Sequence, residues 1–509
     1  MNKMAMVLIV FLSVVAFSLS EKIFMVGFGS STCDSSFEEL VSKGFAGIIF
    51  YTRNMRDAES VKRLTECARK SGVKFIAIDH EGTFINRFRH IDGFIPPNAM
   101  ALGSANDPTL AYLSGYYSAI TLKELGFNMD LAPVLDVNSN PYNPVIGVRS
   151  FWSTPERVAR IGIAFMKGLL DGGVIPVIKH FPGHGDTSVD SHTGLPVIDE
   201  DFETFYRTHV YPFSKAIGEG APAVMTAHII VKSWDRSPAT LSEWIIGYLK
   251  KRMCFKGMVM SDDMMMKAVW IYAKENGIDP IVEAFRAGVD LILVSDPERA
   301  IEFSKKLDEA IEKGYVKRPI EDALVRINRT LNSIEKKEIK PSMTPEEVLD
   351  QVARRSIAAW DGRPLKVGDR ILLLYPTNFI APPKNYKETI KNLKFQLEFR
   401  GLYVDVESFD VKDPNIFVSN DYDAVLLLSV DLNRYESERI FVGKILRNFK
   451  RVILVAIRSP YDIMYVKPHP DRYVVTYDWN EHYPKYLASI LTGEMKALGE
   501  FVAKELGGM

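Results

Sequence analysis

Short runs of apolar and β-branched residues alternate with longer stretches of helical periodicity from Lys22 onward. This alternation is typical of repeated strand–helix units. Eight such runs precede residue 300, and we expect strands at residues 23–28, 46–50, 74–79, 128–132, 175–179, 222–227, 257–261 and 290–294. Eight strands separated by helices, over the length typical of the fold, predict a (β/α)8 TIM barrel rather than an open sheet.

Helix signals agree with this spacing. Thr154 reads as an N-cap, with Pro155 at the first helical position, and opens a helix through residues 166–173. The last barrel helix should end near Ile334, followed by a linker-like segment, a helix through Trp360 and a turn. A second alternating pattern, with expected strands at residues 370–375, 402–406, 424–430, 451–457 and 473–477, predicts a smaller α/β sandwich with a mainly parallel sheet.

The start of the chain has the layout of a secretory signal peptide. A lone Lys3 precedes an apolar run from Met4 to Phe17, and small residues follow. We therefore expect an exported protein, periplasmic or secreted, that meets a membrane only if this segment is left uncleaved. The predicted organisation is a signal peptide at 1–20, a catalytic barrel at 21–340, a linker at 341–368 and the α/β sandwich at 369–509.

Composition narrows the class of ligand. The formal net charge is −1, which gives no reason to expect a nucleic-acid partner and favours a neutral or weakly charged small substrate. Cys33, Cys67 and Cys254 are odd in number, widely separated and without a metal-binding spacing. They predict neither a disulfide framework nor a zinc site, and we expect buried or inert thiols.

The segment KHFPGHGDTSVDSHTGLP, residues 179–196, is the richest in candidate chemistry, and it begins where the fifth strand ends. Barrel enzymes place their catalytic loops at this end of the strands. Asp190 and His192 are two residues apart, so the carboxylate can orient an imidazole that donates and accepts a proton. A purely structural histidine is the alternative, and a metal site from His180, His184, His192 and His228 is a weaker one, because no recognised ligand spacing is present.

Further candidates follow other strands at the same face. Asp262 comes directly after the seventh strand, where it can act as a catalytic carboxylate, although adjacent acids can also cap a helix, a role that suits Asp263. The other candidates at this face are Asp79 after the third strand, Arg87 shortly beyond it, Arg149 after the fourth and His228 after the sixth. Because these residues converge on one face of the barrel, the pattern favours substrate binding over isolated salt bridges.

Together these segments resemble glycoside hydrolase family 3, and within it the bacterial β-N-acetylglucosaminidase branch. The resemblance covers residues 22–334, and the KHFPGHGDTxxDSH segment is its most specific part. It implies that Asp262 is the nucleophile and that His192, supported by Asp190, is the general acid/base. It implies sugar-binding roles for Asp79, Arg87, Arg149, Lys179 and His180.

The resemblance also implies a retaining, exo-acting hydrolysis through a covalent glycosyl-enzyme, with no metal or organic cofactor. Peptidoglycan fragments and chitooligosaccharides present the same terminal sugar, so the natural substrate stays open. Phosphorolysis is an alternative, because an imidazole tolerates phosphate better than a carboxylate does, and a non-catalytic sugar-binding cell-wall protein is another. This chain reads GTFINRF at residues 82–88, where the family commonly reads GGRVQRF.

Overall fold

Eight parallel strands form a closed barrel in the computed structural model, which describes residues 19–88, 90–191, 194–335, 337–416, 418–419 and 421–502. An isolated parallel bridge between Met260 and Leu291 joins the last strand of the sheet order to the first. In sheet order the strands are β10 (Ile292–Val294), β1 (Phe24–Val26), β2 (Gly47–Phe50), β3 (Phe75–Ile78), β4 (Met129–Asp130), β5 (Ile175–Phe181), β7 (Ala223–Thr226) and β9 (Met258–Ser261). The predicted TIM barrel is confirmed.

Helices surround these strands and explain why the strand sequences are continuous apolar runs, since both faces of the sheet are covered. Proline at the first turn opens several of the helices, as Pro155 does after Thr154. The helices are α1 (Ser35–Val41), α2 (Ala58–Lys70), α3 (Ala99–Ala105), α4 (Pro108–Glu124), α5 (Pro155–Asp171), α6 (Phe202–Phe205), α7 (Tyr211–Gly218), α8 (Glu243–Gly247), α9 (Lys267–Asn276), α10 (Pro280–Ala287), α11 (Pro297–Glu312) and α12 (Ile320–Leu331). A small parallel pair, β6 (Val197–Ile198) with β8 (Ile230–Val231), was not predicted.

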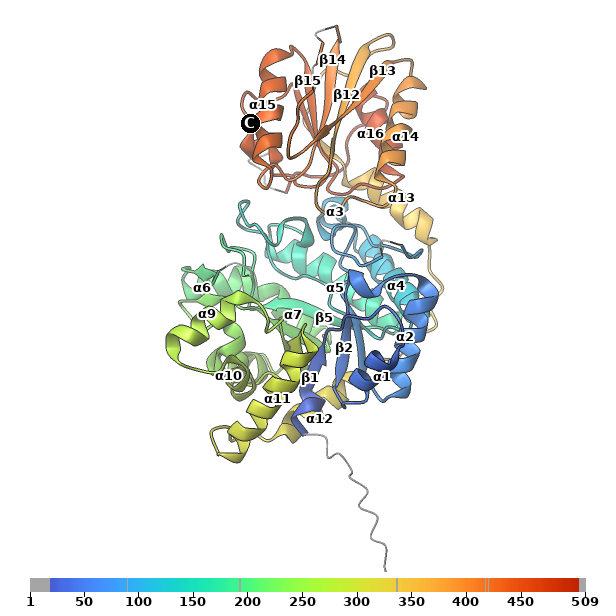
Figure 1. Cartoon of the computed structure of the whole chain (residues 1–509). Helices are drawn as coiled ribbons and strands as arrows, with labels where there is room; N and C mark the ends of the chain where they lie inside the picture. Colours follow the sequence, from blue (N-terminus) through green and yellow to red (C-terminus); the bar gives the residue numbers. More distant parts are fainter. Residues whose placement is uncertain are drawn as a thin grey trace, which may run out of the picture.

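The second domain is a six-stranded sheet with helices on both faces (Figure 1). Its strands are parallel except β11, so the predicted α/β sandwich with a mainly parallel sheet is confirmed. In sheet order the strands are β11 (Ala358–Ala359), β16 (Arg472–Val475), β15 (Val452–Ala456), β14 (Ala424–Ser429), β12 (Arg370–Thr377) and β13 (Tyr403–Asp410). Its helices are α14 (Tyr386–Glu398), α15 (Glu436–Asn448) and α16 (Tyr483–Thr492).

The carboxyl ends of the two sheets face each other across the domain boundary. Asp478, which follows β16, accepts hydrogen bonds from the Thr83 hydroxyl at 3.0 Å and the Asn98 backbone N–H at 3.2 Å. Tyr461, in the loop after β15, accepts one from the Asn138 amide at 2.8 Å. Arg434, after β14, donates to the Pro144 carbonyl oxygen at 2.8 Å. The second domain therefore lies over the mouth of the barrel.

The segment expected to be a linker contains regular structure. Helix α13 (Pro345–Ser356) lies within it and packs against α3, α4 and α16. The prediction that this helix runs through Trp360 is wrong, because α13 ends at Ser356 and the chain then pairs with the second sheet as β11. The predicted signal peptide lies outside the described residues except for Leu19 and Ser20, which belong to the short helix η1 (Leu19–Ile23).

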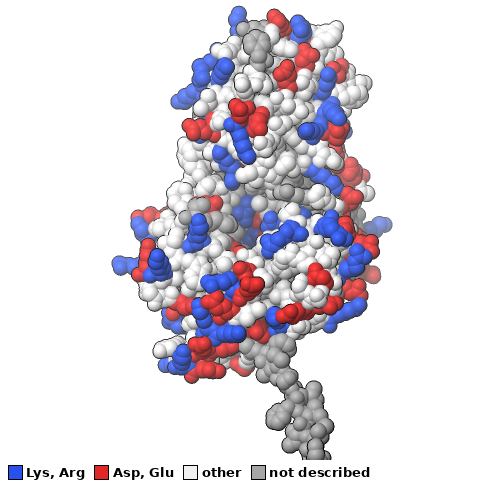
Figure 2. Space-filling view, in the orientation of Figure 1, with Lys and Arg blue, Asp and Glu red and all other residues white. Residues whose placement is uncertain are grey.

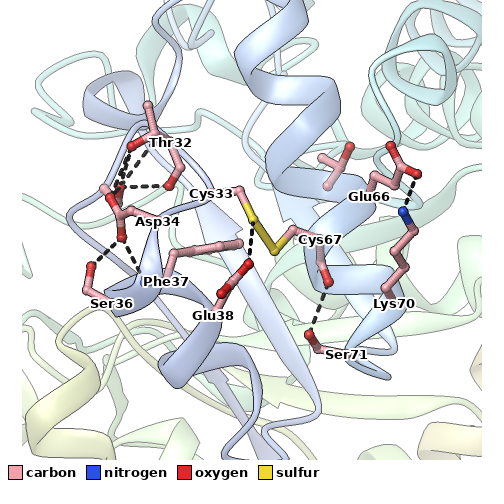
Figure 3. Close-up of a disulfide and its surroundings, with 12 residues drawn as sticks. Thr32, Cys33, Asp34, Ser36, Phe37, Glu38, Glu66, Cys67, Lys70 and Ser71 are labelled. Atoms are coloured by element: carbon pink, nitrogen blue, oxygen red, sulfur yellow. Dashed lines mark hydrogen bonds and ion pairs between the residues drawn. A yellow bond between two sulfur atoms is a disulfide. The ribbon is translucent and has the colours of Figure 1, made fainter.

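The prediction for the cysteines is also wrong. Cys33, just before α1, and Cys67, near the end of α2, form a disulfide, while Cys254 is a free and exposed thiol (Figure 3). The two cysteines are 34 residues apart, and only the packing of α1 beside α2 brings them together. Sequence spacing alone could not pair them because no local motif links such distant positions.

The surface is of mixed charge. Lysine and arginine are interspersed with aspartate and glutamate over the face shown in Figure 2, as the near-zero net charge leads one to expect.

Among the described residues, none of the helices is both long and apolar enough to cross a bilayer.

Candidate active site

A pocket of about 840 Å³, including space open to solvent, lies at the carboxyl end of the barrel strands. Among the described residues, it gathers side chains from the barrel strands and from loops that follow β2, β3, β4, β5 and β9. Six of the predicted site residues line it: Asp79, Arg87, Arg149, Lys179, His180 and Asp262. The barrel thus brings together residues that are up to about 180 positions apart in the chain, as the fold predicts for a catalytic centre.

A chain of buried ion pairs forms one side of the pocket. The Lys179 ammonium lies 2.9 Å from Asp79 Oδ1 and 2.6 Å from Glu81 Oε1. The Asp79 carboxylate also accepts a hydrogen bond from Arg87 Nη2 at 2.7 Å. Glu81 accepts two bonds from Arg149, from Nε at 2.8 Å and from Nη2 at 2.9 Å, in the bidentate geometry that fixes a guanidinium in place.

These pairs keep the acids ionised. Burial alone would raise the pKa of Asp79, but the charges of Lys179 and Arg87 outweigh it and hold that pKa well below its ordinary value. Burial is likewise outweighed at Glu81, whose pKa is lowered by Arg149 and Lys179. The pocket wall therefore offers fixed carboxylate acceptors and cationic donors, the groups that bind sugar hydroxyl and acyl oxygens.

Asp262 and Asp263, adjacent in sequence, have opposite environments. Although burial opposes it, the pKa of Asp262 is lowered by electrostatic interaction with the His180 and His228 rings and by a 2.7 Å hydrogen bond from the Asp263 backbone N–H. Burial raises the pKa of Asp263, whose Oδ1 accepts the backbone N–H groups of Met265 and Ser295. Asp263 thus ties two loops together, while Asp262 is a pocket carboxylate that is ionised at neutral pH.

The helix-capping alternative for these acids does not describe their geometry. Helix α9 begins at Lys267 with Met266 at its N-cap, so neither aspartate caps it. Met266 itself lines the pocket, while Met264 is fully buried, so this methionine run contributes both to the wall and to the core.

His228 contacts the backbone of Asp263. It is buried, it is not among the described side chains that line the pocket, and it contacts the Thr240 hydroxyl at 2.9 Å and the Asp263 carbonyl oxygen at 3.1 Å. Burial lowers the pKa of His228 and favours the neutral ring. Its predicted place among the substrate-binding residues stays a prediction.

Asp136, which the sequence analysis did not nominate, anchors the end of β5 and the start of the loop that follows it. Its Oδ2 lies 2.7 Å from His180 Nδ1, and its Oδ1 accepts the backbone N–H of His184 at 2.6 Å. Burial lowers the pKa of His184 to about 4, so this ring is neutral. A carboxylate on Nδ1 fixes the His180 ring so that its Nε2 faces the pocket and Arg149, 3.5 Å away.

The loop that follows is pressed against the barrel. A Cβ at Gly185 would overlap the Val137 carbonyl oxygen, so only glycine allows this approach. Ser191 lines the pocket, and its carbonyl oxygen accepts the Ala268 N–H at 3.3 Å. Asp190 is half-buried, and its backbone oxygen accepts the Gly194 N–H at 3.0 Å. His192, the predicted acid/base, lies outside the described residues.

The sequence analysis missed two polar residues of the pocket lining, Glu81 and Tyr51, and the carboxylate of Asp136, which holds His180. Glu81 stands two positions after Asp79, so its position just after the third strand could have identified Glu81 as it identified Asp79. Tyr51 directly follows β2, and its position after a strand was the available signal. Asp136 sits in the apolar run LAPVLDV, and an acid in such a run is itself a sign of a buried partner.

Comparisons with known proteins agree with this geometry. Residues 18–330 match the glycosyl hydrolase family 3 N-terminal domain. A β-hexosaminidase of Thiobacillus denitrificans is 35% identical over 292 residues, covering 55% of this chain and 80% of that protein. β-Hexosaminidase A of Pseudoalteromonas piscicida is 33% identical over 315 residues, covering 55% of this chain and 52% of that protein, so this chain spans about half its length.

Similarity in structure extends over both domains. A family 3 β-N-acetylglucosaminidase from Paenibacillus sp. str. FPU-7 has a TM-score of 0.85 and 28% sequence identity, and the match covers 96% of this chain and 98% of that one. The family match covers more than half of the chain and includes the strands and loops that build the pocket. The chain therefore belongs to glycosyl hydrolase family 3 and is a glycoside hydrolase.

Proposed function

We propose that this protein is a retaining, exo-acting β-N-acetylglucosaminidase that removes terminal non-reducing β-linked N-acetylglucosamine from peptidoglycan fragments or chitooligosaccharides. The observation that carries the proposal is Asp262, an ionised pocket carboxylate opposite the Asp79, Lys179, Glu81 and Arg149 network. The names of the relatives supply the sugar, since the proteins from Thiobacillus and Paenibacillus are called a β-hexosaminidase and a β-N-acetylglucosaminidase.

In the first step Asp262 attacks the anomeric carbon while the glycosidic oxygen leaves with a proton from His192. In the second step His192 takes a proton from water, which releases the sugar with retained configuration and frees Asp262. Asp190 orients His192 and stabilises its cation. The support for this pair is the DSH motif at residues 190–192 and the position of the neighbouring Ser191 in the pocket lining.

The remaining network holds the sugar during both steps. Asp79 accepts hydrogen bonds from hydroxyl groups, and Lys179, Arg87 and Arg149 donate to oxygen atoms. Because these groups are already paired and buried, they meet the sugar with little reorganisation.

The test compares p-nitrophenyl β-N-acetylglucosaminide with the β-glucoside, each with and without phosphate, while proton NMR follows the anomer released first. We expect cleavage of the N-acetyl sugar, release of the β-anomer and no phosphate dependence. Release of the α-anomer would contradict retention, and sugar 1-phosphate among the products would contradict hydrolysis. Turnover of neither substrate would contradict the proposed activity.

We also propose that the protein is exported. The apolar N-terminal segment supports this, and so does the Cys33–Cys67 disulfide, because such bonds persist mainly in oxidising compartments. Alkylation of the unreduced protein, followed by mass spectrometry, should label Cys254 alone, and the N-terminus of protein recovered from cells should lie near residue 21. Labelling of all three cysteines, or an unprocessed cytosolic protein, would contradict export.

A further inference from the structure

A second large pocket, the outer groove, lies on the outside of the barrel. It encloses about 1170 Å³, including space open to solvent, compared with about 840 Å³ for the active-site pocket. Its lining comes from α8, from the π-helix η6 (Tyr248–Arg252) that continues α8, from the segment before α8 and from Arg286 of α10. Among the described residues, the two linings have no member in common, so the outer groove is a separate site.

One face of this helix provides most of the outer groove. The residues that line the groove from α8 and η6 are Trp244, Gly247, Tyr248, Lys251 and Arg252. Their spacing is that of a single helix face, and at about 1.5 Å per residue the stripe is about 12 Å long. It can therefore contact two linked sugar rings. Its second half is in the π-helical form, which is rare and occurs frequently at functional sites.

Two aromatic rings are offered along this stripe. Trp244 is 64% exposed, which is unusual because tryptophan is highly buried on average. The ring of Tyr248 is held in place by Trp234, at 5.1 Å between ring centres, and by Tyr206, at 6.3 Å. At Gly247 an added Cβ would meet no atom of the described residues within 4 Å, so the groove is open beside the rings. Because a pyranose ring has an apolar C–H face, aromatic rings with open space beside them suit its binding.

The charges of the outer groove favour an anionic ligand. Its two carboxylates already have partners, since Asp235 accepts backbone N–H groups of its own loop at 2.6 and 3.3 Å and Glu243 lies 3.6 Å from Arg286 Nη1. Lys251 and Arg252 are exposed, and no carboxylate among the described residues forms an ion pair with either of them. These two cations are therefore available to carboxylate groups of a ligand.

We propose that the outer groove is a second carbohydrate-binding site, which holds a chain of sugars that carries carboxylate groups. The rings of Trp244 and Tyr248 contact the sugar faces, and Lys251 and Arg252 bind the carboxylates. The inference deepens the proposed function and rests on it, because it favours acidic glycans, such as peptidoglycan fragments, over neutral chitooligosaccharides. The groove retains the polymer at the enzyme and takes no part in bond cleavage.

The experiment titrates the full-length enzyme by calorimetry with a hexasaccharide of alternating glucuronic acid and N-acetylglucosamine. Glucuronic acid at its non-reducing end protects the chain from an exo-acting N-acetylglucosaminidase, so binding is measured without turnover. Trp244→Ala and the double variant Lys251→Ala/Arg252→Ala should each raise Kd about tenfold. Gly247→Leu, which places a side chain in the open space and keeps the helical φ of −61°, should raise Kd as much without loss of stability.

A matched control removes the same kinds of side chain elsewhere. Tyr315→Ala/Lys317→Ala deletes an exposed ring and an exposed cation between α11 and α12, outside the outer groove, and should leave Kd unchanged. The same hexasaccharide with its carboxylates reduced to alcohols should bind the wild type at least about fivefold more weakly. In every variant, kcat and KM on p-nitrophenyl β-N-acetylglucosaminide should stay within about twofold, because the outer groove is separate from the active-site pocket.

Three outcomes would overturn the inference. The first is that the wild type does not bind the hexasaccharide, or that the groove variants bind it as tightly as the wild type does. The second is equal affinity for the acidic and the reduced chain, since the cations would then have no role. The third is equal affinity for a single-stranded DNA hexanucleotide, which would indicate a general polyanion surface. Continued turnover of the aryl glycoside would leave the glycosidase proposal intact in each case.

Discussion

The mouth of the barrel and the facing edge of the second sheet are both carboxyl ends of parallel strands, yet the pKa values of Asp79 and Asp262 in the barrel shift in the opposite direction to those of buried acids in the second domain. In the barrel, Asp79 and Asp262 have lowered pKa values because cations, imidazoles or backbone N–H groups surround them. In the second domain, burial raises the pKa of Asp462 to about 7 and that of Glu438 well above its ordinary value. The same position in a fold thus gives reactive carboxylates or neutral structural acids, depending on whether cations are supplied.

This difference assigns separate tasks to the two regions. An ionised carboxylate among fixed donors can bind a sugar or attack it, whereas a neutral acid acts as an ordinary hydrogen-bonding group. Asp462 accepts bonds from Ser429 and the Leu432 N–H within its own domain, and Asp478, whose pKa burial raises to about 6, accepts bonds from Thr83 and Asn98 across the boundary. The second domain therefore uses its acids to hold loops and domains in place.

The largest expected effect belongs to Asp262. Asp262→Asn should lower kcat on p-nitrophenyl β-N-acetylglucosaminide by at least about a thousandfold, because an amide cannot form the glycosyl-enzyme. Asp199→Asn is the control, since Asp199 is an exposed residue paired with Lys232 on the surface. Residual activity above a few per cent in Asp262→Asn, measured on freshly purified protein, would rule out this residue as the nucleophile.

A matched pair of glutamates tests the comparison directly. Glu81→Gln leaves Lys179 and Arg149 without a shared carboxylate, and it should cost about 3 kcal/mol of unfolding free energy together with most of the activity. Glu438→Gln replaces an acid that burial favours as neutral, so the cost should stay below about 1 kcal/mol. Urea denaturation of both variants measures these values, and equal costs would remove the distinction between the two regions.

The pH dependence of stability should have opposite signs in the two regions. The folded state keeps the Asp462 proton up to about pH 7, while the unfolded chain releases it near pH 4. The stability from this group is therefore fully present below about pH 4 and is lost as pH rises through about 7, whereas that from Asp79 and Asp262 is lost on acidification.

The stability of Asp462→Asn relative to the wild type should therefore rise by about 3 kcal/mol from pH 5 to pH 8, because each of the two pH units between pH 5 and the folded pKa of about 7 contributes about 1.4 kcal/mol. Asparagine can keep both hydrogen bonds, from the Leu432 N–H and with the Ser429 hydroxyl. Urea titrations of the two proteins at pH 5, 6, 7 and 8 measure the difference. A constant offset across that range would show that Asp462 does not titrate there.

The smallest expected effect concerns the domain boundary. Thr83→Val removes one hydrogen bond to Asp478 while keeping the shape of the side chain, and it should cost about 1 kcal/mol. Activity on the aryl glycoside should change by less than twofold, because Thr83 is outside the described pocket lining. Thr83→Ser, which keeps the hydroxyl, is the control. A loss of activity as large as that of Glu81→Gln would mean that the boundary also shapes the active site.

The sequence by itself determined the barrel, the second parallel sheet and the position of six residues of the pocket lining. Continuous apolar runs identify strands that are buried on both faces, and no tertiary information is needed to find them. An acid or cation directly after such a run, such as Asp79 or Asp262, is expected at the mouth of a barrel. These features are local, so one-dimensional patterns are enough to find them.

Only the tertiary structure decided which distant groups meet. It paired Cys33 with Cys67, joined Glu81 to Lys179 and Arg149, and separated the charge states of the neighbours Asp262 and Asp263. It also placed His228 against the Asp263 backbone, outside the described pocket lining, and it formed the outer groove. Disulfide pairing, burial and electrostatic partnership depend on through-space distance and local dielectric, and neither is encoded in the spacing of residues along the chain.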